Sequence, residues 1–354
     1  MFCDQCRFSD SLNQPSKVFL SSDNEVLVGE LCDRFRDWKE PWQFEQDYLE
    51  IQSQTFLSVL DFLVADSPTA IADHALEEVL LVHLEQDAPF SPRALKKARS
   101  LLWWKRVLSS RELLEVLQQK RLCIHFHPII EAKTHQIFGY ECLCRGLLED
   151  GALIPPARLF EQARTSGLLF ELDRSAREAA LRTAKEKIAG KHIFINFLPT
   201  AIYNPNHCLR STVRWVEELG LDPQKIVFEV VETEQVKNVG HLCRVLNHYR
   251  EQGFKIALDD VGSGYSSLLQ LLALRPDFMK IDREIIAGID HTPAKQSVMG
   301  ALHQIAGDNG ITVLAEGVET RAEQQYLEAQ GIPLLQGFLF GKPSPDPAPK
   351  IEVT

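Results

Sequence analysis

The chain has 354 residues and a formal net charge of -11 at pH 7. This acidic balance argues against a nucleic-acid polymer or an anionic membrane surface as the main partner, because both are polyanions. No apolar run approaches the roughly 18 residues of a membrane span, and the N-terminus lacks the features of a signal peptide. Since the eight cysteines are scattered along the chain, we expect a cytoplasmic protein with free thiols.

Residues 1–109 are predicted to form a small, mostly helical N-terminal domain with a regulatory or interaction role, whose signal or partner the sequence does not indicate. Helical periodicity covers residues 56–64, 75–84 and 92–108, and no strong series of strands accompanies it. Cys3 and Cys6 form a CxxC pair, and Cys32 could join them in a metal site. Ordinary thiols are favoured over structural zinc, because zinc needs four ligands and only a histidine could supply the fourth.

Residues 110–354 show a different pattern, in which short apolar runs alternate with amphipathic stretches that end at glycine, the usual left-handed helix cap. Eight strand-like runs predict an α/β fold, a (β/α)8 TIM-like barrel whose sheet is covered on both faces. Residues 129–138 leave only about ten positions between the first two runs, whereas a parallel crossover needs a dozen or more. We therefore expect the first strand to run antiparallel to the second, through a hairpin at "EAKTHQ".

Each strand-like run ends in polar residues that a packed barrel interior does not need. Because the C-terminal ends of barrel strands meet at one mouth, these side chains are expected to converge there. Their oxygen-rich composition suits Mg²⁺, Mn²⁺ or Ca²⁺ rather than zinc held by thiolates. Two such cations, about 3.5–4 Å apart and sharing a carboxylate, would suit in-line attack on a phosphodiester. The strand-end residues are His127, Glu141, Arg145, Asn196, Glu229, Glu232, Asp259, Asp260, Lys280, Glu316 and Gln336.

Seven short motifs make this region resemble the EAL-domain cyclic di-GMP phosphodiesterases. They are "YECLCRG", "INFLP", "FEVVE", "LDDVGSGYSSL", "FMKID", "LAEGVET" and "QGFLFGKP", in the family's order and spacing over roughly residues 110–347. The resemblance implies hydrolysis of cyclic di-GMP to linear pGpG with two Mg²⁺ or Mn²⁺ ions, inhibition by Ca²⁺, and a barrel with an antiparallel first strand. It also implies a homodimer formed through the barrel.

The resemblance further implies a role for each matching residue. Lys280 would hold the attacking water, as general base or orienter, and a lysine beside two dications is expected to have a lowered pKa. The implied catalytic residues are Lys280, Glu316 and Glu141. The implied metal ligands are Glu141, Asn196, Glu229, Asp259, Asp260 and Glu316, with Asp259 shared. The implied substrate-binding residues are His127, Leu143, Arg145 and Gln336. The implied regulatory loop, which couples the metal site to dimerisation, includes Glu232, Gly262, Ser263 and Gly264.

Three positions depart from the family's pattern. Cys142 stands where the family has alanine, and Val261 where it has the phenylalanine of "DDFG". His127, in "FHPI", stands where the family usually has glutamine; we expect its imidazole to contact a guanine, although it could instead be a core histidine. A cyclic di-GMP receptor or protein-interaction module that binds without hydrolysis is the alternative class. The retention of every metal ligand and of Lys280 favours the enzyme.

Overall fold

The structure is a computed structural model that describes residues 12–45, 47–64, 73–88, 90–199, 202, 209–231, 239–262 and 273–347. The chain forms two compact units, one of residues 1–121 with 148–172 and the other of residues 122–147 with 173–354. The units therefore interleave along the sequence, and the predicted boundary between residues 109 and 110 stays a prediction. Within the described ranges, no helix is both long and apolar enough to cross a membrane.

The N-terminal unit contains a five-stranded sheet in the order β2-β3-β1-β4-β5, in which every pairing is antiparallel. Its strands are β1 (Ser16–Ser21), β2 (Trp42–Glu45), β3 (Tyr48–Ser53), β4 (Leu80–Glu85) and β5 (Arg99–Ser100). Its helices are α2 (Glu25–Phe35), α3 (Phe56–Val64), α4 (Asp73–Glu78), α5 (Pro92–Leu95), α6 (Leu101–Ser109), α7 (Arg111–Gln118) and α8 (Pro156–Ser166), with the short strand β8 (Leu153–Ile154) before α8. Helix α3 packs against β1 and β3.

This sheet corrects the expectation that no strong series of strands accompanies the helices of the N-terminal domain. The separate N-terminal domain is present, but two stretches predicted as helical contain strands. Residues 75–84 divide into the end of α4 and most of β4, and residues 92–108 divide into α5, β5 and α6. A short apolar run such as "VLLVHL" fits helical and strand periodicity equally well, so pairing with β1 decides its conformation.

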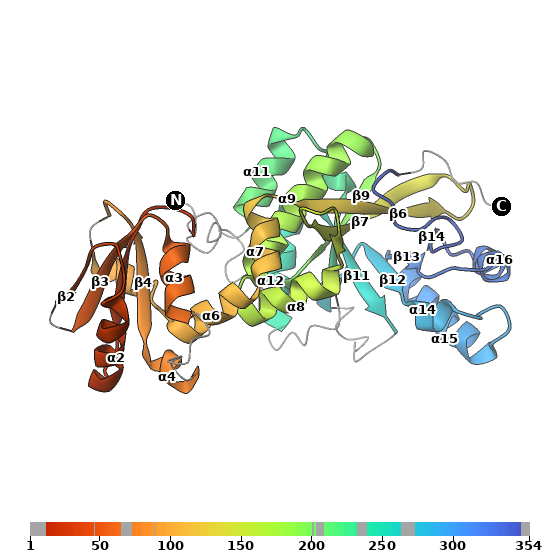
Figure 1. Cartoon of the computed structure of the whole chain (residues 1–354). Helices are drawn as coiled ribbons and strands as arrows, with labels where there is room; N and C mark the ends of the chain where they lie inside the picture. The colour runs from red at the N-terminus through yellow and green to blue at the C-terminus, as the bar shows by residue number, and fades with distance from the viewer. Residues whose placement is uncertain are drawn as a thin grey trace. The chain divides into compact units, whose positions relative to one another are not determined.

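The second unit contains the predicted barrel (Figure 1). Seven strands run parallel to their neighbours, in the order β7, β9, β10, β11, β12, β13 and β14. Strand β6 pairs antiparallel with β7 and with β14 and thereby closes the ring. The hairpin between β6 and β7 is therefore confirmed. The strands are β6 (Leu122–Glu131), β7 (Ile137–Leu147), β9 (His192–Phe197), β10 (Ile226–Val231), β11 (Lys255–Val261), β12 (Phe278–Ile281), β13 (Thr312–Ala315) and β14 (Leu334–Gln336).

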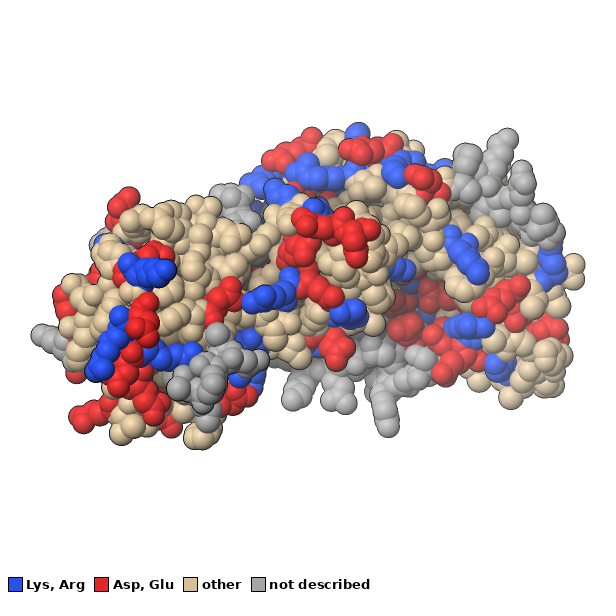
Figure 2. All heavy atoms as spheres, viewed as in Figure 1, with Lys and Arg blue, Asp and Glu red and all other residues tan. Residues whose placement is uncertain are grey.

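Helices alternate with these strands, as the sequence predicts. They are α9 (Leu169–Lys187), α11 (Arg210–Glu218), the 3-10 helix η3 (Pro223–Lys225), α12 (Val239–Glu251), α14 (Arg283–Ile286), α15 (Pro293–Asp308) and α16 (Arg321–Ala329). Glycines follow several of them in the left-handed region, for example Gly253 after α12 with φ +86° and Gly331 after α16 with φ +78°. On the face drawn in Figure 2, basic and acidic side chains are interspersed rather than gathered into one broad basic surface.

One layer of apolar side chains fills the barrel interior and positions the site. It consists of Ile129, Phe194, Val227, Ala257, Phe278, Leu314 and Leu334, and we call it the apolar layer. Because side chains on one face of a strand recur every second residue, the position two residues nearer the mouth points into the same interior. Those positions hold His127, Asn196, Glu229, Asp259, Lys280, Glu316 and Gln336.

Candidate metal centre

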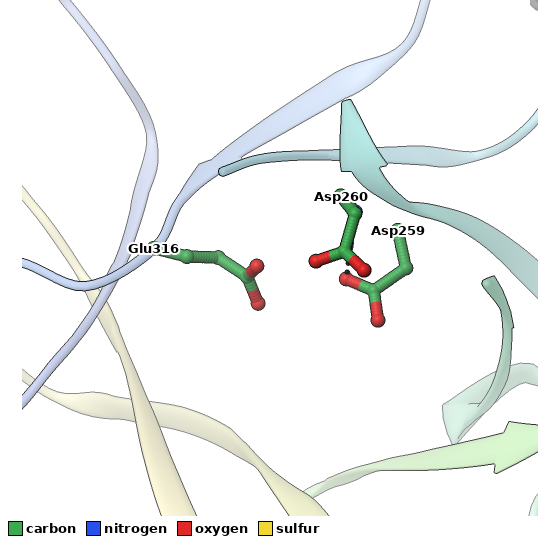
Figure 3. Close-up of side chains that lie close together, drawn as sticks. All are labelled: Asp259, Asp260 and Glu316. Carbon is green, nitrogen blue, oxygen red and sulfur yellow. Dashed lines mark hydrogen bonds between the residues drawn. The ribbon is translucent and has the colours of Figure 1, made fainter. Parts of the chain in front are cut away.

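Three carboxylates at the mouth face one another. Asp259, Asp260 and Glu316 each offer an oxygen atom, and these atoms all lie within 4.8 Å of one another. Figure 3 shows the three carboxylate groups directed toward a common space, the two aspartates from β11 and the glutamate from the segment after β13. This is a suitable arrangement for a hard divalent cation, which prefers oxygen ligands.

A local irregularity in β11 brings two adjacent aspartates to the same side. In a regular strand, Asp259 and Asp260 would point to opposite faces. The register between β11 and β12 shifts between Leu258 and Val261, and Asp260 has a φ of +55°. A non-glycine residue in this region is strained, and such strain concentrates at functional sites. Gly262, two residues after Asp260, has φ +108°, and a Cβ there would lie 2.2 Å from Cδ1 of Ile285.

Lys280 lies at the centre of the cluster with 1% of its side chain exposed. Its Nζ is 2.7 Å from Glu229 Oε1, 2.8 Å from Asp259 Oδ1, 2.8 Å from Glu316 Oε1 and 3.9 Å from Glu141 Oε1. Burial alone would lower the pKa of Lys280, but these four carboxylates raise it well above its usual value. With only protein groups around it, Lys280 is therefore an ammonium ion. The lowered pKa that we expect applies to the site when it holds two dications.

One ammonium ion cannot neutralise the carboxylates around it. Burial, followed by repulsion from Asp259 and Glu141, raises the pKa of Glu316 to about 8 although Lys280 opposes the shift. Burial and Asp259 raise the pKa of Asp260 to about 6. Burial likewise raises the pKa of Glu229 well above its usual value, and no described residue donates a hydrogen bond to its buried Oε2. The donor set thus has more negative charge than the protein balances, and it fits divalent cations.

Glu141 is held in place by three neighbours. Its Oε1 accepts a hydrogen bond from Asn196 Nδ2 at 3.2 Å, and its Oε2 accepts one from Gln336 Nε2 at 2.9 Å. Gln336 Nε2 also donates to His127 Nδ1 at 2.9 Å. Burial would raise the pKa of Glu141, but Lys280, followed by His127 and Gln336, lowers it to about 2. With its Nδ2 turned toward Glu141, the amide oxygen of Asn196 is left for a cation.

The remaining predicted residues lie farther from this cluster or outside the described residues. Leu143 and Arg145 follow Glu141 along β7, and Arg145 Nη1 donates to the carbonyl oxygen of Cys144 at 2.9 Å. No described contact joins Arg145 to the carboxylates. Glu232, Ser263 and Gly264 of the regulatory loop lie outside the described residues, as do Cys3 and Cys6.

His127 and one unpredicted residue form the edge of the site. The His127 side chain is 13% exposed, and its buried Nε2 has no hydrogen-bond partner among the described residues. The ring of Phe338 lies 6.0 Å from the His127 ring, and Lys342 Nζ lies 5.4 Å from the Phe338 ring centre. The Phe338 side chain is 52% exposed. The available sequence signal was its position two residues after Gln336, within "QGFLFGKP".

A family model described as "EAL domain" matches residues 110–343. The Escherichia coli protein PdeG, named a probable cyclic di-GMP phosphodiesterase, is 31% identical over 222 residues, which are 62% of this chain but only 44% of PdeG. The chain thus spans less than half the length of this curated relative.

Two solved structures extend the comparison. A standalone EAL protein from Vibrio cholerae O395, in its cyclic di-GMP-bound form, has a TM-score of 0.59 and 33% identity, and the match covers 65% of this chain and 95% of that one. BlrP1 from Klebsiella pneumoniae, in a complex with calcium and cyclic di-GMP, has a TM-score of 0.60 at 22% identity and covers 95% of this chain and 98% of its own. The BlrP1 likeness concerns the fold alone. Because the family model covers well over half of the residues and agrees with the barrel and its motifs, the chain belongs to the EAL domain family.

Proposed function

We propose that the protein is a metal-dependent phosphodiesterase that hydrolyses cyclic di-GMP to linear pGpG. The observation that carries this proposal is the buried cluster in which Lys280 contacts carboxylates that it cannot neutralise alone. The name of PdeG and the ligand of the Vibrio cholerae structure support the same substrate class.

EAL domains bind divalent metals, and the donor set of this chain fits them. Glu141, Asn196, Glu229 and Asp259 would hold one Mg²⁺ or Mn²⁺ ion. Asp259 and Asp260 would hold the second, and Glu316 would complete the set directly or through water. When bound, such ions neutralise phosphate charge and lower the pKa of a coordinated water. We expect Ca²⁺ to fill the site without supporting hydrolysis.

Lys280 is the proposed catalytic group that orients water or accepts its proton. Its Nζ is within 3 Å of three carboxylates, so it is fixed where those ligands converge. As an ammonium ion it can donate a hydrogen bond to water; as a neutral amine it could also accept a proton. Glu141 and Glu316 complete the proposed catalytic residues, because each both contacts Lys280 and offers oxygen to a cation.

The proposed substrate contacts surround this centre. Arg145 would bind a phosphate, because its planar guanidinium matches phosphate oxygens. His127 would donate from Nε2 to a guanine, since Gln336 already occupies its Nδ1. Gln336 and Leu143 would line the nucleotide site. Phe338 is added to this set because its half-exposed ring offers a stacking surface for a base.

The rest of the proposal concerns regulation. The N-terminal domain, predicted as residues 1–109, would tune the activity of the barrel, predicted as residues 110–354, because every candidate catalytic residue lies in the latter. The loop of Glu232, Gly262, Ser263 and Gly264 would couple the metal centre to a homodimer formed through the barrel. We place the reaction in the cytoplasm, where its nucleotide substrate would be made.

The test incubates the purified full-length protein with cyclic di-GMP and either Mn²⁺ or Mg²⁺ and separates the products by chromatography. Formation of pGpG that stops when a chelator is added and returns with metal supports the proposal. Tight binding of cyclic di-GMP without pGpG, in the presence of either metal, would identify a receptor or interaction module instead.

A further inference from the structure

A second group of buried polar side chains lies beside the metal centre without belonging to it. Asp173 and Arg177, both on α9, are 2% and 0% exposed, and Thr212 on α11 is 0% exposed. Arg177 donates to Asp173 Oδ2 from Nη2 at 2.8 Å and from Nε at 3.2 Å, and its Nη1 donates to Thr212 Oγ1. We call these three residues the buried brace.

The buried brace is attached to the strand that carries a predicted metal ligand. Asp173 Oδ1 accepts the backbone N–H of Leu198 at 3.0 Å. Leu198 is the first residue after β9, and the pairing of β9 with β10 ends one residue earlier, at Phe197. The Asp173 carboxylate therefore accepts the first backbone N–H after the β9–β10 pairing ends. This hydrogen bond fixes the direction in which the chain leaves β9.

Asn196 lies two residues before this anchored N–H. It faces Glu141, to which its Nδ2 donates at 3.2 Å. A buried ion pair is weak evidence for stability, because desolvation of both charges offsets their attraction. The directional hydrogen bonds of the Asp173–Arg177 pair, by contrast, hold the backbone of Leu198 in one position. Side chains behind metal ligands commonly act in this way.

We infer that Asp173 and Arg177 are positioning residues that hold the end of β9, and hence the amide of Asn196, in place for a divalent cation. This inference rests on the proposed function, because it concerns the same metal centre. Asp173 and Arg177 contact neither the cation nor the substrate; they act through the backbone of Leu198. Loss of the brace should weaken cation binding while the barrel remains folded.

The test compares Mn²⁺ affinity by calorimetric titration in the parent and in the double variant Asp173→Leu/Arg177→Met, which replaces the pair with apolar side chains of similar length and shape. Changes behind a metal ligand typically weaken affinity 10–100-fold, and we expect a loss in that range. Arg182→Met is the matched control, because Arg182 makes an i,i+4 pair with Glu178 on the exposed side of α9; it should bind Mn²⁺ like the parent. Thermal unfolding of each variant checks the fold.

Repeating the titration in the presence of Asn196→Ala separates an effect on the position of Asn196 from a general effect on the structure. If the brace acts through Asn196, the double variant should lose little further Mn²⁺ affinity when Asn196→Ala is already present. Full additivity, or unchanged affinity of the double variant, overturns the inference. If the double variant does not fold, Thr212→Val serves instead: weaker Mn²⁺ binding supports the inference and unchanged binding overturns it. A parent that binds no Mn²⁺ would remove the proposed function, and the inference with it.

Discussion

Two buried ionic clusters among the described residues of the barrel differ in charge balance. In the buried brace, the guanidinium of Arg177 donates to the carboxylate of Asp173 and to the hydroxyl of Thr212, and the same carboxylate accepts the backbone N–H of Leu198. Around Lys280, one ammonium faces four carboxylates, and an oxygen of Glu229 has no donor among the described residues. A balanced cluster is complete within the protein, whereas an unbalanced one is suited to a ligand of opposite charge. The comparison separates scaffold from site without reference to the family.

The largest expected effect follows removal of the central cation from the unbalanced cluster. Lys280→Ala keeps every proposed metal ligand but removes the group that is proposed to orient or deprotonate water, and such contributions are typically about 10²–10⁴-fold in rate. Turnover should fall by that factor while cyclic di-GMP still binds in the presence of metal. Product chromatography and calorimetric titration on the same sample measure both quantities. Lys255→Ala is the control, because Lys255 lies at the end of β11 opposite to Asp259 and its Nζ is 2.9 Å from Asp277 Oδ1. Parental turnover in Lys280→Ala would show that the assigned role is wrong.

Removal of one partner from the balanced cluster should mainly affect stability. Arg177→Met leaves Asp173 buried without its counter-ion, and breaking a buried pair in this way costs about 3–5 kcal/mol of the free energy of unfolding. Arg182→Met, which removes an exposed pair from the same helix, should cost less than about 1 kcal/mol. Urea unfolding of the two variants gives the difference directly. Equal losses would mean that the burial of Arg177 does not matter.

A partly buried histidine in the N-terminal unit provides a third case, a titratable group to which no described residue supplies a counter-ion. Burial, and then Lys97, lower the pKa of His83 to about 4; its Nε2 lies 2.8 Å from Ser16 Oγ and its ring stacks on Phe56. Because the folded pKa lies below the ordinary value of 6.5, the stabilisation is complete above pH 6.5 and is lost as pH falls toward 4. The free energy of unfolding should fall by up to about 3 kcal/mol over this pH range. His83→Gln should flatten the dependence of unfolding free energy on pH in that window; parallel profiles for the two proteins would contradict this.

Removal of one charge from the unbalanced cluster should act in the opposite direction to Arg177→Met. Glu229→Gln relieves repulsion among buried carboxylates, so the chelator-treated variant should be as stable as the parent or more stable by on the order of 1 kcal/mol. The variant should also lose most of the rise in melting temperature that Mn²⁺ gives the parent, because a ligand stabilises only the state that binds it. Thermal scans with chelator and with Mn²⁺ measure both. A marked loss of stability in chelator would show that the cluster is balanced after all.

The smallest expected effect on the reaction itself concerns His127. His127→Gln restores the family's residue but removes an aromatic neighbour of Phe338. We expect a change of roughly ten-fold or less in KM, equivalent to about 1.4 kcal/mol, with kcat nearly unchanged, because the residue is proposed to contact the base rather than the phosphate. Steady-state kinetics separates the two constants. A change confined to kcat would place His127 with Glu141 in the metal centre instead of with the nucleotide.

The comparison also shows where sequence reasoning succeeds. The strand-end side chains were predictable because a barrel brings strand ends together and because strand periodicity keeps them two residues from the apolar layer. The antiparallel first strand was predictable from the length of one connection. Both predictions rest on numbers of residues that backbone geometry fixes: the two-residue period of a strand and the minimum length of a parallel crossover.

Other features depend on burial, which spacing does not show. Asp173–Arg177 and Glu178–Arg182 have the same charges, the same i,i+4 spacing and the same helix, yet the first pair is buried and the second exposed. The backbone of Asp260 depends on a register shift against β12 that neither strand indicates alone. The N-terminal sheet depends on pairing between segments too short to be distinguished from helices.

The two-residue offset between the apolar layer and the polar mouth has an evolutionary consequence. A point substitution can delete one proposed ligand, as at Glu229, and leave the strand in place. A one-residue insertion or deletion within β10 cannot move that ligand gradually, since it would exchange the inward and outward faces of the strand and turn Phe228 or Val230 toward the interior. The centre can therefore be inherited intact or lost, but it cannot migrate along the strands. Variation among descendants of this chain should accumulate in the loops beyond the mouth.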